Sequence, residues 1–320
     1  MNKIFLILIV AIGVLSLIFM GCENTRDRED AIPDDAIKIT PDMDMFPPIL
    51  HSDGWKDPIP MSSMINTAGL EDSPFITPDG SMFFFFFTPD VNVPVEKQMI
   101  DGVTGIWYSK KQDSQWLKPE RVILSKSISL DGCPSMQGEK LWFCSIRGGN
   151  YGEVDVYNAI YKDGEWLDWK NAGEQLNRDY DIGEFHISSD GNTIYFGWDN
   201  STGFGGRDIW KSENINGTWN TPINLGENIN SDLNEDQPFI TSDGNELWFT
   251  GQSRLGYPGL AIFRSIKIEN GKWSTPDEII SNFAGEPTLD DQGNIYFVHH
   301  FFSKDMKMIE ADIYVAYIKQ

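Results

Sequence analysis

A repeated spacing of tryptophan and proline limits the fold of this chain more than any other feature of its sequence. Tryptophan stands three positions before proline in four places and before a second tryptophan in a fifth: Trp55/Pro58, Trp116/Pro119, Trp166/Trp169, Trp219/Pro222 and Trp273/Pro276. The copies recur every 50 to 61 residues. Repeats with a period of this order indicate a chain built from similar supersecondary units that pack side by side.

Each repeat also contains the pattern of a β-hairpin. In the first copy, Pro74–Gly80 ends in an Asp-Gly turn and is followed by the aromatic run Met82–Phe87. Asp-Gly between two apolar runs favours a tight hairpin, because glycine accepts the positive φ that the turn needs. We expect a third strand at Gly105–Tyr108 and a fourth, outer strand at the tryptophan–proline segment, where a missing N–H is tolerated. Four antiparallel strands per repeat predict the blades of a β-propeller.

Five copies of this pattern predict an all-β fold, a five-bladed β-propeller over residues 51–320. Gln320 follows directly after the third strand of the fifth copy, whereas Gly54–Pro58 supplies an additional fourth strand ahead of the first. We expect this N-terminal strand to complete the last blade, because a ring closed in that way has no unpaired seam. An open β-solenoid is the alternative, but it does not account for the complementary ends.

The N-terminal segment has the layout of an export signal. Lys3 is followed by the largely apolar stretch Ile4–Met20 and then by Gly21 and Cys22. The last four residues resemble the cleavage box of bacterial lipoproteins, with Phe19 where that box usually has leucine. We therefore expect residues 1–22 to be a lipoprotein signal peptide with Cys22 as the acylated residue, and residues 23–50 to be an acidic, flexible tether. An uncleaved membrane helix is the alternative, and both place the body outside the cytoplasm on a membrane.

The charge of the chain restricts its partners. The formal net charge is -23 at pH 7, from 48 acidic and 25 basic residues. Such a surface repels phosphate groups, so we expect no nucleic acid partner. Cations and neutral ligands are favoured.

Three sequence elements carry a resemblance to a known family. The Pro-Asp-Gly turn, the segment 203–210 and the segment 224–231 resemble the WD40-like (PD40) propeller repeats of TolB-like proteins and other bacterial envelope proteins. The resemblance covers roughly residues 55–320 and implies a propeller in the cell envelope, but it implies no ligand. TolB-type propellers have six blades, so the count of five departs from them, and five blades are familiar from lectins and certain glycoside hydrolases.

A column of acidic residues precedes the proline of the first strand by three positions or nearly so. Its members are Glu71, Asp131, Asp181 and Glu235. The simpler interpretation is that these carboxylates accept hydrogen bonds from backbone N–H groups where the strands begin. The functional alternative is a ring that holds Ca²⁺, a cation that prefers oxygen ligands.

Polar residues that interrupt the repeat gather in the third and fifth copies. We expect these to face the central funnel and to form a binding site: Glu184, His186, Trp198, Glu286, His299 and His300. An aromatic plane beside carboxylates and imidazoles suits a sugar or another small ligand. If the protein is an enzyme, Glu184 and Glu286 are the candidate catalytic pair of a glycoside hydrolase or lyase. Ordinary packing is the alternative for the histidines, and with four histidines in the chain a zinc site is not favoured.

Two cysteines flank the short hairpin of the second copy. If its turn centres on Gly138 and Glu139, Cys133 and Cys144 are cross-strand partners. In an oxidising compartment such a pair permits a disulfide, and two buried thiols are the alternative.

The sequence contains no P-loop, dinucleotide-binding fingerprint, Gly-x-Ser-x-Gly elbow or His-Glu-x-x-His motif. The leading hypothesis is thus a lipid-anchored binding or scaffolding propeller for a glycan, a peptide or an envelope protein. A polysaccharide-cleaving enzyme is the alternative, and no cofactor other than Ca²⁺ is expected.

Overall fold

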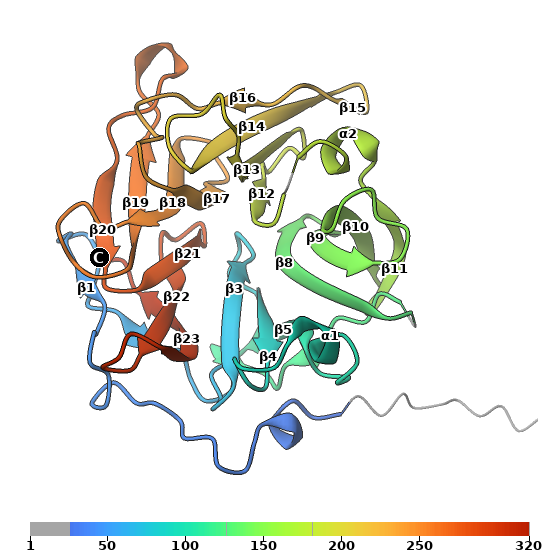
Figure 1. Ribbon diagram of the computed structural model, residues 1–320, viewed down its shortest axis with the longest axis vertical. Coiled ribbons are helices and arrows are strands. Elements are labelled where there is room, and N and C mark those ends of the chain that lie inside the picture. The colour runs from blue at the N-terminus through green and yellow to red at the C-terminus, as the bar shows by residue number, and fades with distance from the viewer. Residues whose placement is uncertain (1–25, 126, 181, 320) are drawn as a thin grey trace, which may run out of the picture.

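The computed structural model describes residues 26–125, 127–180 and 182–319, and these form an all-β fold (Figure 1). The strands are β1 (Ile49–Leu50), β2 (Ile59–Pro60), β3 (Leu70–Ile76), β4 (Met82–Thr88), β5 (Gly105–Gln112), β6 (Gln115–Trp116), β7 (Glu120–Arg121), β8 (Ser129–Gln137), β9 (Lys140–Arg147), β10 (Asp155–Lys162), β11 (Glu165–Asn171), β12 (Phe185–Ile187), β13 (Thr193–Asp199), β14 (Arg207–Ile215), β15 (Thr218–Trp219), β16 (Ile223–Asn224), β17 (Glu235–Ile240), β18 (Glu246–Gln252), β19 (Leu260–Ile266), β20 (Asp277–Ser281), β21 (Ala284–Leu289), β22 (Ile295–Phe302) and β23 (Met308–Ala316). The helices are short: α1 (Val95–Gln98), α2 (Glu174–Asn177) and the 3₁₀ turns η1 (Glu29–Ala31) and η2 (Glu269–Gly271). No helix in these ranges is long and apolar enough to cross a membrane.

The strands form antiparallel units that follow one another along the chain. Unit 1 contains β3 to β7, unit 2 β8 to β11, unit 3 β12 to β16, unit 4 β17 to β20 with β1 at its edge, and unit 5 β21 to β23 with β2. A single parallel pair, Ala311 with Leu70, links units 5 and 1. The predicted all-β, antiparallel architecture is confirmed.

The first strands of the units surround a common centre (Figure 1). In turn, β3 contacts β8, β8 contacts β12, β12 contacts β17, β17 contacts β21, and β21 contacts β3. Aromatic side chains fill the space between neighbouring units. Between units 1 and 2, for example, Phe84 and Tyr108 of unit 1 pack against Trp166 of unit 2, with ring centroids 6.1 Å and 5.8 Å apart. The resulting arrangement is propeller-like.

The outer strand differs from its expected position. In units 1 and 3 the tryptophan pairs at the tip of the hairpin, as Trp116 does with Lys111, and pairing resumes only after the proline. Proline has no N–H to donate and interrupts the ladder at this point. Unit 2, which has Trp169 in the proline position, is consistent with this explanation, because its outer strand β11 is assigned as one strand from Glu165 to Asn171, with a bulge at Asp168.

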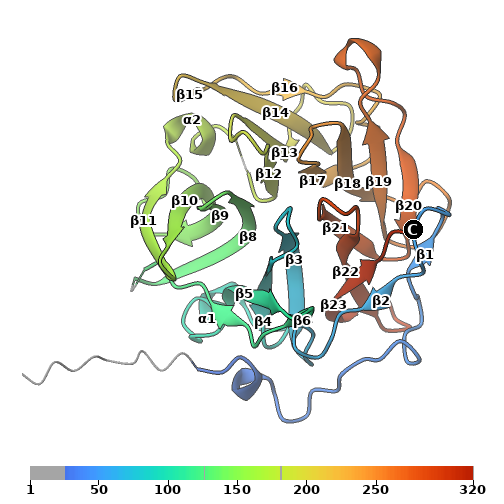
Figure 2. The same cartoon turned by 180° about the vertical axis from the view of Figure 1, so that it is seen from behind.

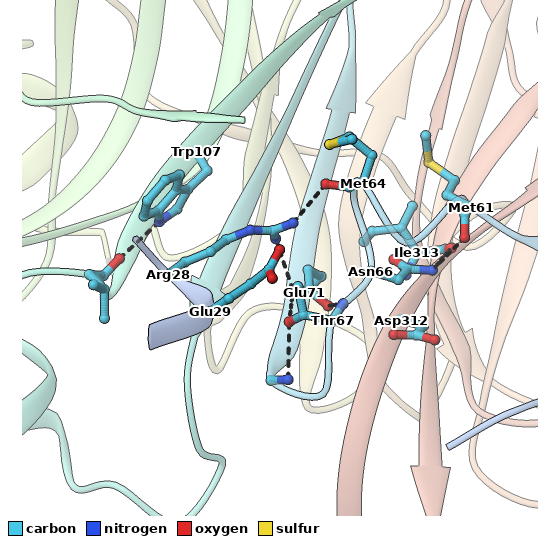
Figure 3. A network of polar contacts seen from close by, with 12 residues as sticks. Arg28, Glu29, Met61, Met64, Asn66, Thr67, Glu71, Trp107, Asp312 and Ile313 are labelled. Carbon is cyan, nitrogen blue, oxygen red and sulfur yellow. Dashed lines mark hydrogen bonds and ion pairs between the residues drawn. The ribbon is translucent and has the colours of Figure 1, made fainter. Parts of the chain in front are cut away.

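Residues 26–50, the described part of the segment expected to be a flexible tether, instead form a strap that packs against units 1, 5 and 4. Arg28 is 2% exposed and donates to Glu71 Oε1 at 3.0 Å and to the Met64 carbonyl at 2.7 Å (Figure 3). Farther along, Asp44 Oδ2 lies 2.9 Å from His299 Nε2 in a buried contact. The acidic composition of this segment predicted disorder. It did not reveal that single residues of the segment, such as Arg28 and Asp44, each bind a buried side chain of the body.

Lys38 of the strap pairs with two carboxylates of β23, Glu310 and Asp312. Burial raises the pKa of Asp312 to about 8, and Lys38 counteracts part of this rise. In the unfolded chain this carboxyl titrates near pH 4. The folded state therefore keeps a proton that the unfolded state releases.

This proton predicts a pH dependence of stability. Its contribution is fully present below about pH 4 and is lost as the pH rises to about 8. The side chain of Asp312→Asn cannot titrate. Between about pH 4 and 8 we therefore expect the unfolding free energy of this variant to decline by at least about 1 kcal/mol less than that of the wild type. Urea unfolding at pH 5, 6, 7 and 8 measures the effect, and the exposed Asp53→Asn is the matched control. Identical slopes for wild type and Asp312→Asn would contradict the assignment.

Candidate functional site

A narrow cavity lies where the five units meet. Its volume is about 40 Å³, which leaves room for only a few water molecules. Every unit contributes side chains to its wall: Ser73, Pro74 and Phe75 from unit 1, Cys133 and Pro134 from unit 2, Glu184, Phe185 and His186 from unit 3, Gln237, Pro238 and Phe239 from unit 4, and Glu286, Pro287 and Thr288 from unit 5. The predicted pair Glu184 and Glu286 is thus brought together.

A strained backbone turn places the polar residues on this wall. Ser73, Cys133, Gln237 and Glu286, each directly before the proline of the inner strand, have φ between 46° and 55°. The strand pairing shifts register at the same positions, which are β-bulges. Residues with a side chain rarely adopt this left-handed conformation, and such strain is concentrated at functional sites.

Glu286 is the best-connected carboxyl in the cavity. It accepts hydrogen bonds from the Ser73 N–H at 2.7 Å and from Gln237 Nε2 at 2.6 Å. Its own N–H donates to Thr250 Oγ1 at 2.8 Å. Burial raises the pKa of Glu286 well above its usual range, and the charge of Asp72, to which it is hydrogen-bonded, adds to this. Glu286 therefore favours the neutral acid, whose O–H can donate a hydrogen bond to Asp72.

Glu184 faces the same cavity from unit 3. The Cys133 thiol donates to Glu184 Oε1 at 3.0 Å. Burial raises the pKa of Glu184 well above its usual range, with further contributions from Cys133, Asp236 and Asp72. Asp236 differs from the glutamates, because it forms an ion pair with Arg207 at 2.8 Å. The two glutamic acids of the cavity wall therefore favour the neutral form, and Asp236 with its arginine is not part of that wall.

Two of the predicted histidines lie near this cluster. His186 lines the cavity, lies 4.4 Å from the ring of Phe239 and accepts the Ile240 N–H at its Nδ1 at 3.2 Å. Burial lowers its pKa to about 3, so the ring stays neutral. His300 is close enough to Asp72 for that carboxylate to raise its pKa, although burial lowers the pKa more. Both imidazoles thus offer neutral hydrogen-bonding groups.

The other two predicted site residues have different surroundings. Trp198 packs against Tyr180 and Trp210, with ring centroids 5.0 Å apart in both contacts, and is not part of the cavity wall. His299 is fully buried against Asp44 of the strap. Because neighbouring residues of a strand point to opposite faces, His299 and His300 do not share one site.

The candidate calcium column has other partners in the structure. Glu71 binds Arg28 and the Thr67 N–H, Asp131 binds Arg147 and Ser145, and Glu235 binds Arg254 and the Ser231 N–H. Glu71 and Glu235 therefore accept a hydrogen bond from a backbone N–H, as the simpler interpretation predicted. Asp131 differs, because its partners are the side chains of Arg147 and Ser145. Asp181 lies outside the described residues. The calcium site stays a prediction.

The prediction that Cys133 and Cys144 are cross-strand partners is wrong by one residue. Gly132, not Cys133, lies opposite Cys144, because the bulge at Cys133 shifts the pairing. The Cys144 side chain is hydrogen-bonded to Cys133, whose pKa is raised by this contact and by burial. A disulfide between them stays a hypothesis. Cys22 lies outside the described residues.

Sequence reasoning did not find Ser73, Gln237, Asp72 and Asp236. The column before the proline contains Ser73 and Gln237, but as ordinary polar residues in a strand they carried no signal. Their importance depends on the bulge, which in units 1, 2, 4 and 5 turns one additional side chain of the inner strand toward the centre.

No protein-family model matches the chain, and no curated protein matches it. Among solved structures, the chain is similar to TolB from Acinetobacter baumannii with 13% identity and a TM-score of 0.43, over 80% of this chain and 56% of that one. It thus spans about half the length of that structure. It is also similar to the catalytic domain of a GH62 α-L-arabinofuranosidase from Coprinopsis cinerea, with 8% identity and a TM-score of 0.49 over 78% and 91% of the chains. A third is an α-L-arabinofuranosidase from Lactobacillus brevis, with 13% identity and a TM-score of 0.46 over 77% and 90%. Identities and TM-scores this low do not indicate a shared activity.

Proposed function

We propose that the protein is a closed five-bladed propeller, lipid-anchored through Cys22 on the extracytoplasmic side of a membrane, that binds a neutral, hydroxyl-rich ligand at its central mouth. Closure is supported by β2, which pairs with β23 as the missing outer strand of unit 5, and by the bridge between Trp55 and Ile318 (Figure 2). The cyclic contacts of the inner strands support the blade count. The family resemblance of the repeats supports the envelope location.

The observation that carries the binding function is the convergence of two glutamic acids that favour the neutral form, an amide and one neutral imidazole on one cavity. Neutral acids and imidazoles both donate and accept hydrogen bonds, which suits hydroxyl groups. The cavity itself has a volume of about 40 Å³, so a sugar ring does not fit inside. The ligand therefore lies on the rim and inserts only a terminal group, such as a hydroxyl or hydroxymethyl group. A glycan of the cell envelope is the ligand class that fits best.

This function predicts different effects on glycan affinity for two substitutions of Glu286. Glu286→Gln keeps a neutral donor toward Asp72, so glycan affinity should stay within about threefold. Glu286→Ala removes the hydrogen-bonding group, and the affinity should fall about tenfold. Calorimetry of the full-length chain with a panel of neutral envelope and plant oligosaccharides measures both, and the exposed Glu139→Gln is the control. Equal affinities for wild type and Glu286→Ala would contradict binding at the central mouth.

Glycan cleavage is the second candidate function, and one observation favours it. Burial raises the pKa of Glu286 well above its usual range, whereas Asp236, whose charge acts on Glu184, pairs with Arg207 at 2.8 Å, and glycoside hydrolysis uses one carboxylic acid together with one ionised carboxylate. Here Glu286→Gln, or Glu184→Gln, would abolish product formation while binding persists. Product release from the oligosaccharide panel by the wild type, with none from the glutamine variants, would establish cleavage in place of a purely binding role.

A further inference from the structure

A groove lies at the outer edge of the molecule, between units 1 and 2, away from the centre. Its volume is about 690 Å³. One wall comes from β7 and the residues after it, and the other from the outer strand β11, which lies at the edge of the ring in Figure 1. The residues that matter for its chemistry are Tyr108, Glu120, Arg121, Glu165, Trp166 and Trp169.

Trp169 breaks the repeat in this groove. The other four copies have proline at the equivalent position. Among the 11 tryptophans, all of which lie in the described ranges, Trp169 is the most exposed, at 41%. Proline at this position has a structural explanation, because the other four copies carry it in the outer strand. The fold gives no such explanation for an exposed tryptophan at position 169. Tryptophan combines a large apolar ring with an N–H donor, and it is enriched at binding interfaces for this reason.

A β-bulge places Trp169 beside Trp166. Asn158 pairs with Lys170 and Ile160 pairs with Leu167, so Asp168 and Trp169 together face Ala159. Asp168 has φ of 52°, the left-handed conformation that is unfavourable for a residue with a side chain. In a regular strand, residues three apart point to opposite faces. The bulge therefore turns both indoles toward the groove.

The indole rings of Trp169 and Trp166 are fixed by side chains of the body that pack against them. The Arg147 guanidinium lies 4.5 Å from the ring centroid of Trp169 and is itself 8% exposed. Because this cation covers one face of the indole, the exposed area belongs to the other face and the edge. Trp166 packs on Tyr161 at 4.5 Å and on Tyr108 at 5.8 Å. Such support fixes the rings before any ligand binds, which reduces the entropy cost of binding.

Polar groups line the same groove. Glu120 accepts the Tyr108 hydroxyl at 2.7 Å, and Arg121 donates to the Thr104 carbonyl at 2.8 Å. Glu165 is exposed at the start of β11. The charges of both signs give no strong preference for an anion or a cation.

We propose that this groove is a second binding site, separate from the central mouth, and that it binds a neutral oligosaccharide. The apolar faces of successive sugar rings stack on Trp169 and on the accessible edge of Trp166. Hydroxyl groups bond to Glu120, Glu165 and the groove backbone. The site needs neither the central cavity nor the lipid anchor.

An extended peptide is the competing occupant, since β11 is an edge strand. Strand addition requires a regular row of backbone N–H and C=O groups. The bulge at Asp168 breaks that row in the middle of β11, and bulges are a known protection against such pairing. The strand therefore presents its side chains rather than its backbone.

The test uses the full-length chain and hexasaccharides of the cello, xylo, manno, malto and chito series, with calorimetry and tryptophan fluorescence as readouts. We expect wild type to bind at least one series. Trp169→Ala should weaken that binding at least tenfold and remove the fluorescence change, whereas Trp169→Phe should stay within about threefold because it keeps a stacking face. Phe204→Ala is the matched control, because Phe204 is an exposed aromatic residue, at 50%, on unit 3.

Three results would overturn the proposal. One is the failure of every hexasaccharide to bind the wild type. Another is undiminished binding by a folded Trp169→Ala variant, which would assign the sugar to another site. The last is competition by an extended or proline-rich peptide that binds the groove more tightly than any sugar. Failure of the central site shows separately, as unchanged affinity in Glu286→Ala.

Discussion

Replacing Arg28 with alanine is expected to destabilise the folded protein by about 3–5 kcal/mol. Arg28 is 2% exposed and its partner Glu71 is fully buried, so the change leaves a carboxyl without its cation in the interior. Thr67 still donates to that carboxyl from its N–H and its hydroxyl, but neither group carries a charge (Figure 3). The guanidinium also lies 5.1 Å from the Phe85 ring and 5.5 Å from the Phe87 ring, and these contacts are lost as well. Urea unfolding at pH 7 measures the change.

Two further variants separate the charge from the strap as a whole. Arg26→Ala removes an exposed arginine from the same segment, and its effect should stay below about 0.5 kcal/mol. Arg28→Met combined with Glu71→Gln keeps the volume and removes both charges, so it should recover at least half of the loss. An Arg28→Ala variant as stable as wild type would show that the strap does not contribute to folding.

Replacing Trp55 with alanine should cost about 3–5 kcal/mol, the usual range for a buried aromatic residue. Trp55 pairs with Ile318 near the C-terminus and donates from Nε1 to the Gly293 carbonyl at 2.8 Å. It also packs edge-on against Trp248 of unit 4 at 5.7 Å. The side chain thus joins the N-terminal segment to units 5 and 4 at once. The loss is measured by chemical denaturation of the full-length chain.

Trp169→Ala is the matched control for this prediction, since its indole is 41% exposed and joins no two units. It should cost less than about 1.5 kcal/mol. Trp55→Phe should lie between, because it keeps most of the packing but not the hydrogen bond. If Trp55→Ala unfolds with wild-type stability, the proposed closure through the N-terminal strand is not a main source of stability.

The hairpins and inner strands could be predicted because their signals are local. An Asp-Gly turn between apolar runs, as in Pro74–Gly80, determines where the chain reverses, and β3 and β4 lie on either side of it. The outer strands were displaced from their predicted positions, because the pairing there depends on whether proline interrupts it. The strap was missed because its contacts, such as Arg28 with Glu71, join residues 43 positions apart that share no pattern.

The candidate site was predictable in part for a related reason. Glu184, His186 and Glu286 interrupt a repeat column, and the column lies on the inner strand, so their convergence follows from the topology. The positive φ at Glu286 is not encoded by any typical turn residue, so Asp72 and Gln237 could not be recognised as its partners. His299 shows the converse error. Its position in the aligned repeats predicted that it lies near the funnel. Successive side chains of a strand point to opposite faces, and the His299 side chain points toward Asp44.

The strap also determines how freely the body can move if Cys22 carries the proposed lipid. Arg28 is bonded to Glu71 of unit 1, and it follows Cys22 by six positions, with only five residues between them. A fully extended chain of that length spans about 20 Å, whereas a tether that continued to residue 50 would reach several times farther. The propeller would then stay within a thin layer above the lipid headgroups, with the edge at units 1 and 5 nearest to them. Such a protein could capture only ligands that belong to, or come close to, the surface in which it is anchored.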